Sequence, residues 1–380
     1  MRVLLFLLLL AGCSTRAAEV RVAFDANGRT AARASGIADR ATGRRVTADD
    51  PVRVASISKL VVALGVMRMV EAGTLDLDRD VSDWLGWKLR NPAFPDVPIT
   101  LRLLLSHRSS LADGIDYIVP FPRKLRDALA DPKAWDSAHS PGSTFRYANI
   151  GFPVVASVME RAGGERFDRL MQRLVFVPLA LDACFNWSGC SATKTARAVV
   201  LYRANGEVAR DDLQGAPPPC PVASEAGCDL SSYGLGDNGA LFSPQGGMRL
   251  SMRDLAKIGA LLLRQGDGFL SRESIAELER EAWRFDGANG DTSKGFYCRY
   301  GLATQLLPTP RNGCADDLFG DGAAWSGHAG EAYALRAGLW IDRARGRGVA
   351  FFATAVRDGS RGSSAFSAAE ERLARIGQPR

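Results

Sequence analysis

The sequence predicts an α+β fold in which a mostly helical region is inserted between two parts of a β-sheet. Strand patterns occur near both ends of the chain, and helical patterns dominate the residues between them. This division is typical of α+β proteins. With 380 residues, 46% apolar and 24% charged, the composition is ordinary for a globular protein, which excludes a disordered chain, a collagen and a bundle of membrane spans.

The first predicted element is a β-hairpin. Residues 19–25 alternate in polarity, Asn27-Gly28 is typical of a type I′ turn, and residues 29–37 form the returning strand. Residues 57–72 then predict a helix that is apolar nearly all round. We expect such a helix in the centre of the domain.

Further elements follow from periodicity and capping residues. Helices are predicted at 101–107, 152–162, 167–175 and 252–264, the last behind a Ser251/Asp254 capping box. A Pro- and Gly-rich loop at about 214–247 interrupts them, and 198–203 is strand-like. Near the end, 334–342 and 349–356 predict buried strands and 363–376 an amphipathic helix. We expect one domain over 21–380, with an α/β part at about 21–75 and 286–380 and a helical part at about 76–285.

The N-terminal segment is typical of an export signal, with a charged residue, a short apolar run and a small-residue cleavage zone. Its residues 10–13, Leu-Ala-Gly-Cys, resemble the lipobox of bacterial lipoproteins. The resemblance implies a signal peptide at 1–12, a lipidated Cys13 and a tether at 13–20, with Ser14 favouring the outer membrane. A soluble secretory signal is the alternative. We expect a protein of the periplasm or cell envelope, whose only membrane contact is the lipid anchor.

Six cysteines follow Cys13, without a C-x-x-C pair, which predicts disulfides in an oxidising compartment. Several connectivities are possible, and pairing of neighbours is the simplest: Cys184 with Cys190, Cys220 with Cys228, and Cys298 with Cys314. A zinc site is the weaker alternative because the three histidines, His107, His139 and His328, are far apart. We expect no metal and no organic cofactor.

The net charge and its distribution argue against a nucleic-acid-binding protein. The net charge is +6, from 48 basic and 42 acidic residues spread along the chain. This surplus is too dilute for a nucleic-acid-binding surface. We expect a small-molecule or peptide substrate, no nucleic-acid partner, and a monomer.

The first motif that carries chemistry is Ser56-Ile57-Ser58-Lys59. Positions i and i+3 share one face of a helix, so we expect the Lys59 amine next to the Ser56 hydroxyl. A Lys in an apolar helix wall loses solvation, and a neutral amine can accept the Ser proton. The alternative is a helix N-cap beside a Lys that reaches solvent. Ser191-Ala192-Thr193-Lys194 matches the same pattern, but it follows a predicted disulfide cysteine and precedes a strand-like run.

Two further motifs stand later in the chain. Tyr147-Ala148-Asn149 lies on a predicted turn, where the Tyr can relay a proton and the Asn can hold a substrate carbonyl. His328-Ala329-Gly330 lies immediately before the penultimate predicted strand, where the Gly lets a ligand backbone approach the strand edge. A core Tyr with a turn Asn, and a structural His, are the alternatives for each motif taken alone.

In this order, Ser56-x-x-Lys59, Tyr147-x-Asn149 and His328-x-Gly330 resemble the motifs of the serine β-lactamase and penicillin-binding superfamily. The likeness is to its class C β-lactamase, D-peptidase and esterase branch, and segments 103–111 and 251–259 also resemble that family. The resemblance covers roughly residues 20–380. It implies a five-stranded antiparallel sheet flanked by helices, with the active site in the cleft between the sheet and the helical region.

The resemblance also implies a mechanism. Ser56 becomes acylated, Lys59 and Tyr147 share the general-base work, and water releases the acyl group. The backbone N–H groups of Ser56 and Glu331 form the oxyanion hole. The substrate-binding residues that the resemblance implies are Asn149, His328, Gly330 and Glu331.

The substrate is less constrained. His328 replaces the Lys of the K-T-G motif, and a neutral imidazole offers no fixed charge to the carboxylate of a β-lactam or a D-Ala-D-Ala terminus. Arg336 supplies that charge if its side chain faces the cleft, although we favour a solvated surface position. His107 is interpreted as a helix-end packing residue.

Three classes of function remain open. We expect a β-lactamase or D-peptidase that acts on a β-lactam or a D-amino peptide amide. The alternatives are a carboxylesterase on the same scaffold and a non-catalytic envelope lipoprotein or penicillin sensor. A Ser-His-Asp hydrolase is disfavoured because the chain has no G-x-S-x-G elbow.

Overall fold

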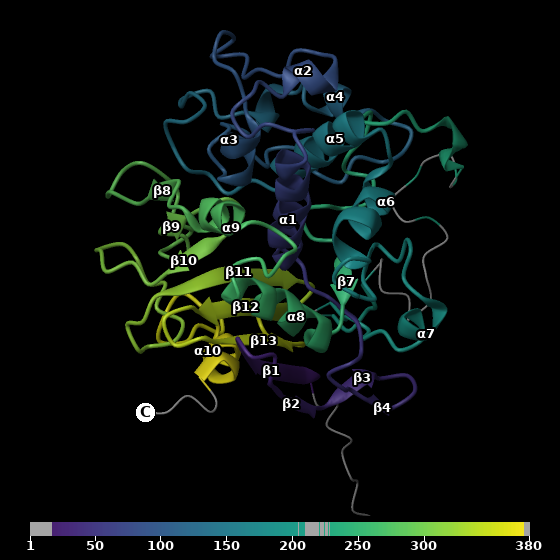
Figure 1. Ribbon diagram of the computed structural model, residues 1–380, viewed down its shortest axis with the longest axis vertical. Helices are drawn as coiled ribbons and strands as arrows, with labels where there is room; N and C mark the ends of the chain where they lie inside the picture. Colours follow the sequence, from purple (N-terminus) through teal and green to yellow (C-terminus); the bar gives the residue numbers. More distant parts are fainter. Residues whose placement is uncertain are drawn as a thin grey trace, which may run out of the picture.

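The computed structural model describes residues 17–203, 205–209, 220, 224, 227 and 229–375. The predicted signal peptide with Cys13, and also Cys228, lie outside the described residues. An eight-stranded antiparallel sheet stands beside a mostly helical region, and the α+β prediction is confirmed (Figure 1). In the part of the chain that the structure describes, no helix has the length and apolar character needed to cross a membrane.

The main sheet runs in the order β2-β1-β13-β12-β11-β10-β9-β8. Its strands are β1 (Glu19–Asp25), β2 (Thr30–Ser35), β8 (Trp283–Arg284), β9 (Arg299–Tyr300), β10 (Gln305–Leu307), β11 (Trp325–Ala332), β12 (Leu335–Asp342) and β13 (Arg347–Ala353). Five long strands form the expected sheet, and three short strands extend it beyond β11. The predicted count of five is therefore too low, because strands of two or three residues show no recognisable alternation.

Two small sheets and the helices complete the fold. The small sheets contain β3 (Ile37–Asp39) with β4 (Arg44–Arg45), and β5 (Val52–Arg53), β7 (Met248–Leu250) and β6 (Cys184–Phe185). The helices are α1 (Ile57–Glu71), α2 (Ser82–Leu85), α3 (Leu101–Leu105), α4 (Leu125–Ala128), α5 (Gly151–Gly163), α6 (Phe167–Met171), α7 (Ala192–Thr195), α8 (Met252–Leu263), α9 (Arg272–Glu279) and α10 (Ala368–Arg375). Every helix predicted from the sequence is present, with ends that differ by a few residues.

Two local predictions are wrong. The turn between β1 and β2 is not type I′, because only Gly28 of the Asn27-Gly28 pair has a positive φ. The Asp25 carboxylate accepts hydrogen bonds from the N–H groups of Asn27 and Arg29, which favours a different turn. The strand-like run at 198–203 contributes only an isolated bridge at Tyr202.

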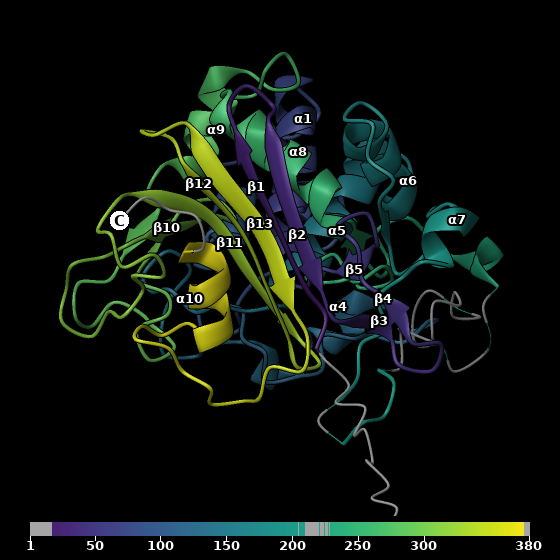
Figure 2. The same cartoon turned by 90° about the horizontal axis from the view of Figure 1, so that it is seen from below.

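Helices cover both faces of the long strands. Helix α8 packs on one face and α10 on the opposite face (Figure 2). The approach of α8 to β1 is close, since a Cβ at Gly259 would lie 2.1 Å from Cζ of Phe24. These contacts hold β12 and β13 in a layer between the two helices.

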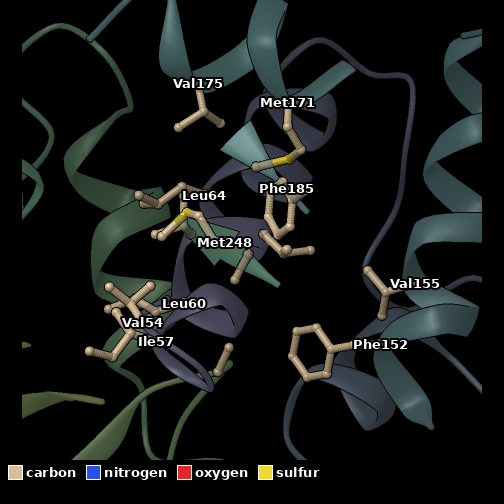
Figure 3. Close-up of a cluster of buried hydrophobic side chains, with 14 of the residues drawn as sticks. Val54, Ile57, Leu60, Leu64, Phe152, Val155, Met171, Val175, Phe185 and Met248 are labelled. Carbon is tan, nitrogen blue, oxygen red and sulfur yellow. The ribbon is translucent and has the colours of Figure 1, made fainter. Parts of the chain in front are cut away.

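Helix α1 is the central element of the fold, as predicted. Almost all its side chains are buried, including the polar Ser58 and Lys59. Figure 3 shows its residues Ile57, Leu60 and Leu64 in one cluster with Phe152, Val155, Met171, Val175, Phe185 and Met248. Because apolar side chains surround α1, its N-terminal end is held in place without a side-chain cap.

Candidate active site

Ser56 occupies the N-cap position of α1, immediately after Ala55, whose φ of 48° is in the left-handed region. Non-Gly residues in this region store backbone strain and cluster at functional sites. The backbone N–H of Ser56 donates to no other group of the described chain. It is therefore available to an oxyanion beside the nucleophile.

The Lys59 amine lies next to Ser56, as the i, i+3 spacing predicts. Its Nζ is 3.0 Å from Ser56 Oγ, and it also donates to Asn149 Oδ1 and to the carbonyl oxygen of Gln245, both at 2.8 Å. Burial lowers the pKa of Lys59 to about 7, although the negative charge of Asp113 opposes this shift. A large share of the molecules thus carries a neutral amine at neutral pH, which is the form that can accept the Ser56 proton.

Tyr147 lies on the other side of the nucleophile. Its ring stacks on Tyr297 at 4.6 Å, and Lys59 Nζ is 4.8 Å from the centre of the Tyr147 ring. The hydroxyl is buried without a hydrogen bond of normal geometry, although Ser56 and Tyr297 are close enough to lower its pKa. Burial is the larger effect and raises the pKa of Tyr147, so this residue is a neutral phenol that can give a proton.

Asn149 is fixed by a residue that the sequence motifs did not reveal. Asp113 Oδ2 accepts from both the backbone N–H and the side-chain Nδ2 of Asn149, at 2.8 and 2.9 Å. Asp113 Oδ1 accepts from the N–H of Ile150. Asp113 therefore orients the amide that holds Lys59. The only feature of the sequence that pointed to Asp113 was its position two residues after segment 103–111, which resembles the family.

His328 does not line the cleft. It belongs to β11, a strand that the sequence did not predict, and it is completely buried. Its Nε2 is 2.7 Å from the Tyr300 hydroxyl and its Nδ1 is 2.6 Å from the carbonyl oxygen of Ala329. Burial, aided by the charge of Lys59, lowers the pKa of His328 to about 3. This imidazole is neutral and has both nitrogens engaged within the protein.

His107 has a packing position, as interpreted from the sequence. It follows α3 and its ring lies 4.2 Å from the Tyr147 ring. Its Nδ1 accepts the N–H of Ala148. Burial lowers its pKa well below the usual value. His107 thus supports the turn that carries Tyr147 and Asn149.

Gly330 permits the close contact between β11 and the segment before the nucleophile. A Cβ at this position would lie 2.2 Å from the carbonyl oxygen of Val54. The absence of a side chain therefore brings the following residue, Glu331, beside Ser56, and both residues line the same hollow.

The cleft around Ser56 has two lobes. We name the hollow of about 600 Å³ that runs toward α10 the α10 lobe, and the hollow of about 400 Å³ beside Asn149 the Asn149 lobe. Both lobes are lined by Ser56, Tyr147, Tyr297 and Glu331. The nucleophile therefore lies where the lobes meet, with space for a substrate group on each side.

Arg336 faces the α10 lobe, which corrects the interpretation as a solvated surface residue. Its side chain is 12% exposed and pairs with Glu331 at 2.8 Å and with Asp358 at 3.4 Å. Glu331 and Arg336 lie directly opposite each other on β11 and β12. Their cross-strand pairing places Arg336 in the cleft and gives the acidic side chain of Glu331 a partner.

Two of the predicted disulfides are present. Cys184 and Cys190 are bonded, as are Cys298 and Cys314. Cys220 has no disulfide partner among the described residues. Its predicted partner, Cys228, lies outside them, so that pairing stays a prediction.

The second S-x-x-K pattern has a structural role. Ser191 caps α7 and donates to Asp182, while Lys194 Nζ donates to the carbonyl oxygen of Asp49. Ser191 and Lys194 therefore do not form a nucleophile and base pair. Among the described residues, no group of three His, Cys, Asp or Glu side chains is arranged to hold a metal ion.

Comparisons with known proteins agree with this site. The chain is 27% identical over 349 residues to the esterase EstB of Burkholderia gladioli, covering 87% of this chain and 84% of that protein. It is 30% identical over 154 residues to penicillin-binding protein 4 of Amycolatopsis lactamdurans, covering 39% of each. The D-amino acid amidase of Ochrobactrum anthropi SV3 has a similar fold, with a TM-score of 0.66 at 19% identity, covering 94% of this chain and 90% of that chain.

A family model describes nearly the whole chain. The Beta-lactamase model matches residues 14–373, which include Ser56, Lys59, Tyr147 and the β11 motif. The match extends over both the sheet and the helical region, and the serine nucleophile with its buried lysine is the arrangement expected of a serine hydrolase. The chain belongs to the beta-lactamase family, in its class C-related branch, and is a serine hydrolase.

Proposed function

We propose that this protein cleaves a D-amino peptide amide or a β-lactam through an acyl-enzyme on Ser56. The observation that carries the proposal is the buried Lys59 amine, with a lowered pKa and 3.0 Å from Ser56 Oγ. This geometry supplies a base for a hydroxyl that is otherwise a weak nucleophile at neutral pH.

In the proposed acylation step, neutral Lys59 accepts the Ser56 proton while Oγ attacks the substrate carbonyl. The negative charge that develops on the carbonyl oxygen is received by the backbone N–H groups of Ser56 and Glu331. Tyr147 gives its proton to the leaving nitrogen and is reprotonated by Lys59. A water molecule then attacks the carbonyl carbon of the acyl group. Lys59 accepts the proton of this water and returns it to Ser56 Oγ as the ester bond breaks.

The charges of the α10 lobe support a substrate that carries a carboxylate. Lys294, Arg357 and Arg361 line this lobe, and none forms an ion pair with an acidic residue of the described chain. Arg336 adds a fourth cation, which Glu331 and Asp358 partly neutralise. A β-lactam or a peptide C-terminus offers a carboxylate of this kind.

A carboxylesterase is the second candidate. Two observations favour it: the imidazole of His328 is neutral and engaged with Tyr300, so the third motif supplies no fixed charge, and the relative that matches most of the chain is named an esterase. An ester also needs less help from a proton donor, because an alkoxide leaves more readily than an amide nitrogen.

We also propose that the protein acts as a monomer in the periplasm or cell envelope, anchored to the outer membrane through a lipid on Cys13. The two disulfides are consistent with a location outside the cytoplasm. Metabolic labelling with a fatty acid tests the anchor, since label should be lost in Cys13→Ser.

Intact-mass spectrometry after mixing with excess penicillin tests the proposed function. An adduct on Ser56 that decays with product release supports a β-lactamase, and a persistent adduct supports a D-peptidase or a penicillin sensor. Hydrolysis of D-alanyl peptides then separates the peptidase from the sensor. The absence of any adduct, with Ser56-dependent hydrolysis of nitrophenyl esters, would favour the esterase instead. Ser56→Ala is the control in every arm and should be inactive.

A further inference from the structure

Gln245 carries a polar side chain that the described protein leaves without a partner. The residue is 4% exposed, and its Oε1 is buried without a hydrogen bond. No hydrogen bond from the described chain reaches its Nε2 either. A buried amide oxygen that loses water and gains no donor from the protein lowers stability, so this oxygen calls for an explanation.

The backbone of Gln245 lies at the reaction centre. Its backbone carbonyl oxygen accepts from Lys59 Nζ at 2.8 Å, and the residue lines the Asn149 lobe together with Ser56. The turn that carries it is well held, because the N–H groups of Gly246 and Gly247 both donate to the carbonyl oxygen of Ser243. The side chain is thus presented from a fixed backbone.

The other carboxamide in the same lobe is already engaged. Asn149 Oδ1 accepts from Lys59, and its Nδ2 donates to Asp113. Gln245 has both of its polar atoms unengaged, and rotation about its last torsion interchanges the oxygen and the nitrogen. It can therefore offer both a donor and an acceptor to a ligand with no competing bond inside the protein, whereas Asn149 shares its amide with Lys59 and Asp113.

We propose that Gln245 hydrogen-bonds a secondary amide in the part of the substrate that fills the Asn149 lobe, and so selects peptide-like substrates. This inference rests on the proposed function and deepens it. A secondary amide offers an N–H and a C=O, which complement the two ends of a carboxamide. Tyr117, Ile118 and Tyr333 also line the lobe, together with Arg53, and Ile118 is 42% exposed. The ring and aliphatic surfaces of Tyr117, Ile118 and Tyr333 suit the apolar flank of an amino-acid residue.

The test uses two thioesters with the same thiol leaving group. One carries an N-acyl-D-alanyl group, and the other is its depsi analogue, in which oxygen replaces the amide N–H. We expect the wild-type protein to hydrolyse the amide compound with a kcat/KM about tenfold higher, the usual effect of one hydrogen bond to a neutral group. In Gln245→Met we expect the two values to differ by less than about twofold.

Thermal unfolding gives a second readout. Met has nearly the volume of Gln and needs no hydrogen bond, so the Tm of Gln245→Met should be unchanged or higher. Gln172→Met is the matched control, because Gln172 donates to the carbonyl oxygen of Ala183 and lines neither lobe. That variant should lose stability and keep the wild-type selectivity.

Each outcome decides between the two proposals. If Ser56-dependent hydrolysis is seen but Gln245→Met keeps the amide preference, or if that variant has a clearly lower Tm, the inference about Gln245 is overturned while the proposed function stands. If the wild-type protein hydrolyses penicillin but neither thioester, the inference about Gln245 is overturned while the proposed function stands. If it hydrolyses neither thioester and forms no penicillin adduct on Ser56, the proposed function fails and this inference fails with it.

Discussion

Asp113 and Asn149 are joined by two hydrogen bonds to a single carboxylate oxygen, one from the backbone and one from the side chain of Asn149. The pair fixes the direction in which Asn149 Oδ1 points, and this atom accepts a hydrogen bond from the Lys59 amine. The position of the base therefore depends on a carboxylate that does not touch it.

Replacing Asp113 tests this dependence. In Asp113→Asn we expect kcat/KM to fall about 10- to 100-fold, because a small displacement of the base raises the barrier of a step that needs close alignment. Loss of the negative charge should also lower the pKa of Lys59, since Asp113 raises it in the native protein. The midpoint of the pH profile should thus move to lower pH.

The matched control is Asp116→Asn, on the same loop. The Asp116 carboxylate accepts a hydrogen bond from the N–H of Ile118 and none from Asn149. Both variants are compared by steady-state kinetics and circular dichroism. Equal activities of the two variants would show that Asp113 does not position the site.

The pH dependence of acylation reports on Lys59. With a pKa of about 7, the amine is protonated below that pH and cannot accept the Ser56 proton. We expect kcat/KM to rise about tenfold per pH unit below pH 7 and to level off above it. The measurement is a pH profile with an uncharged ester at constant ionic strength. A profile that is flat from pH 5 to 9 would be incompatible with Lys59 as the base.

The free energy of unfolding should also depend on pH through Lys59. The folded-state pKa of Lys59 lies below its ordinary value of 10.5, so between about pH 7 and 10 the unfolded chain binds the extra proton. The contribution of Lys59 to the free energy of unfolding therefore increases as the pH rises through this window. Urea unfolding at pH 7 and 9 measures it, and Lys59→Met should lack this part of the pH dependence.

The sequence predicted the contact between Ser56 and Lys59 and the central helix well, because each is defined by neighbouring residues. The i, i+3 relation of Ser56 and Lys59 and the apolar surface of α1 follow directly from helical geometry. Asp113 and Gln245 were missed because their contacts with Asn149 and Lys59 join segments far apart in the chain. No periodicity in either segment indicates such a contact.

The third motif shows a different limit. Strand β11 contains Gly, Ala and Ser in place of the β-branched residues that mark strands, so it was not recognised. The alternation of residues along β12 also did not show which face of the sheet the Arg336 side chain lies on. The face became clear only from the strand register, which places Arg336 opposite Glu331.

Gly330 offers a test of the contact between β11 and the nucleophile segment. A methyl group at this position would lie 2.2 Å from the carbonyl oxygen of Val54, so Gly330→Ala must displace one backbone or the other. We expect the free energy of unfolding to fall by about 1–3 kcal/mol. We also expect kcat/KM to fall, because the N–H groups of Ser56 and Glu331 would move apart. Chemical denaturation and steady-state kinetics measure the two effects.

Gly151→Ala is the control for that substitution. Gly151 is the first residue of α5, and a Cβ there would have its nearest contact at 3.8 Å from Leu104. Stability and activity should remain close to wild type, or stability should rise slightly because Ala favours helix. If Gly330→Ala behaves like this control, the close approach of β11 is not required for activity.

The hydrogen bond between Tyr300 and His328 yields the last prediction. In Tyr300→Phe the imidazole Nε2 loses its partner in a fully buried position, since both residues are completely buried. An orphaned buried polar atom costs about 1–3 kcal/mol, which urea unfolding resolves. Tyr202→Phe is the comparison, because the Tyr202 hydroxyl accepts an exposed hydrogen bond from the backbone N–H of Arg40 and lies beside Asp39 near the surface, so its loss should cost less. Equal stabilities of the two variants would mean that the buried imidazole of His328 does not depend on its hydrogen bond with Tyr300.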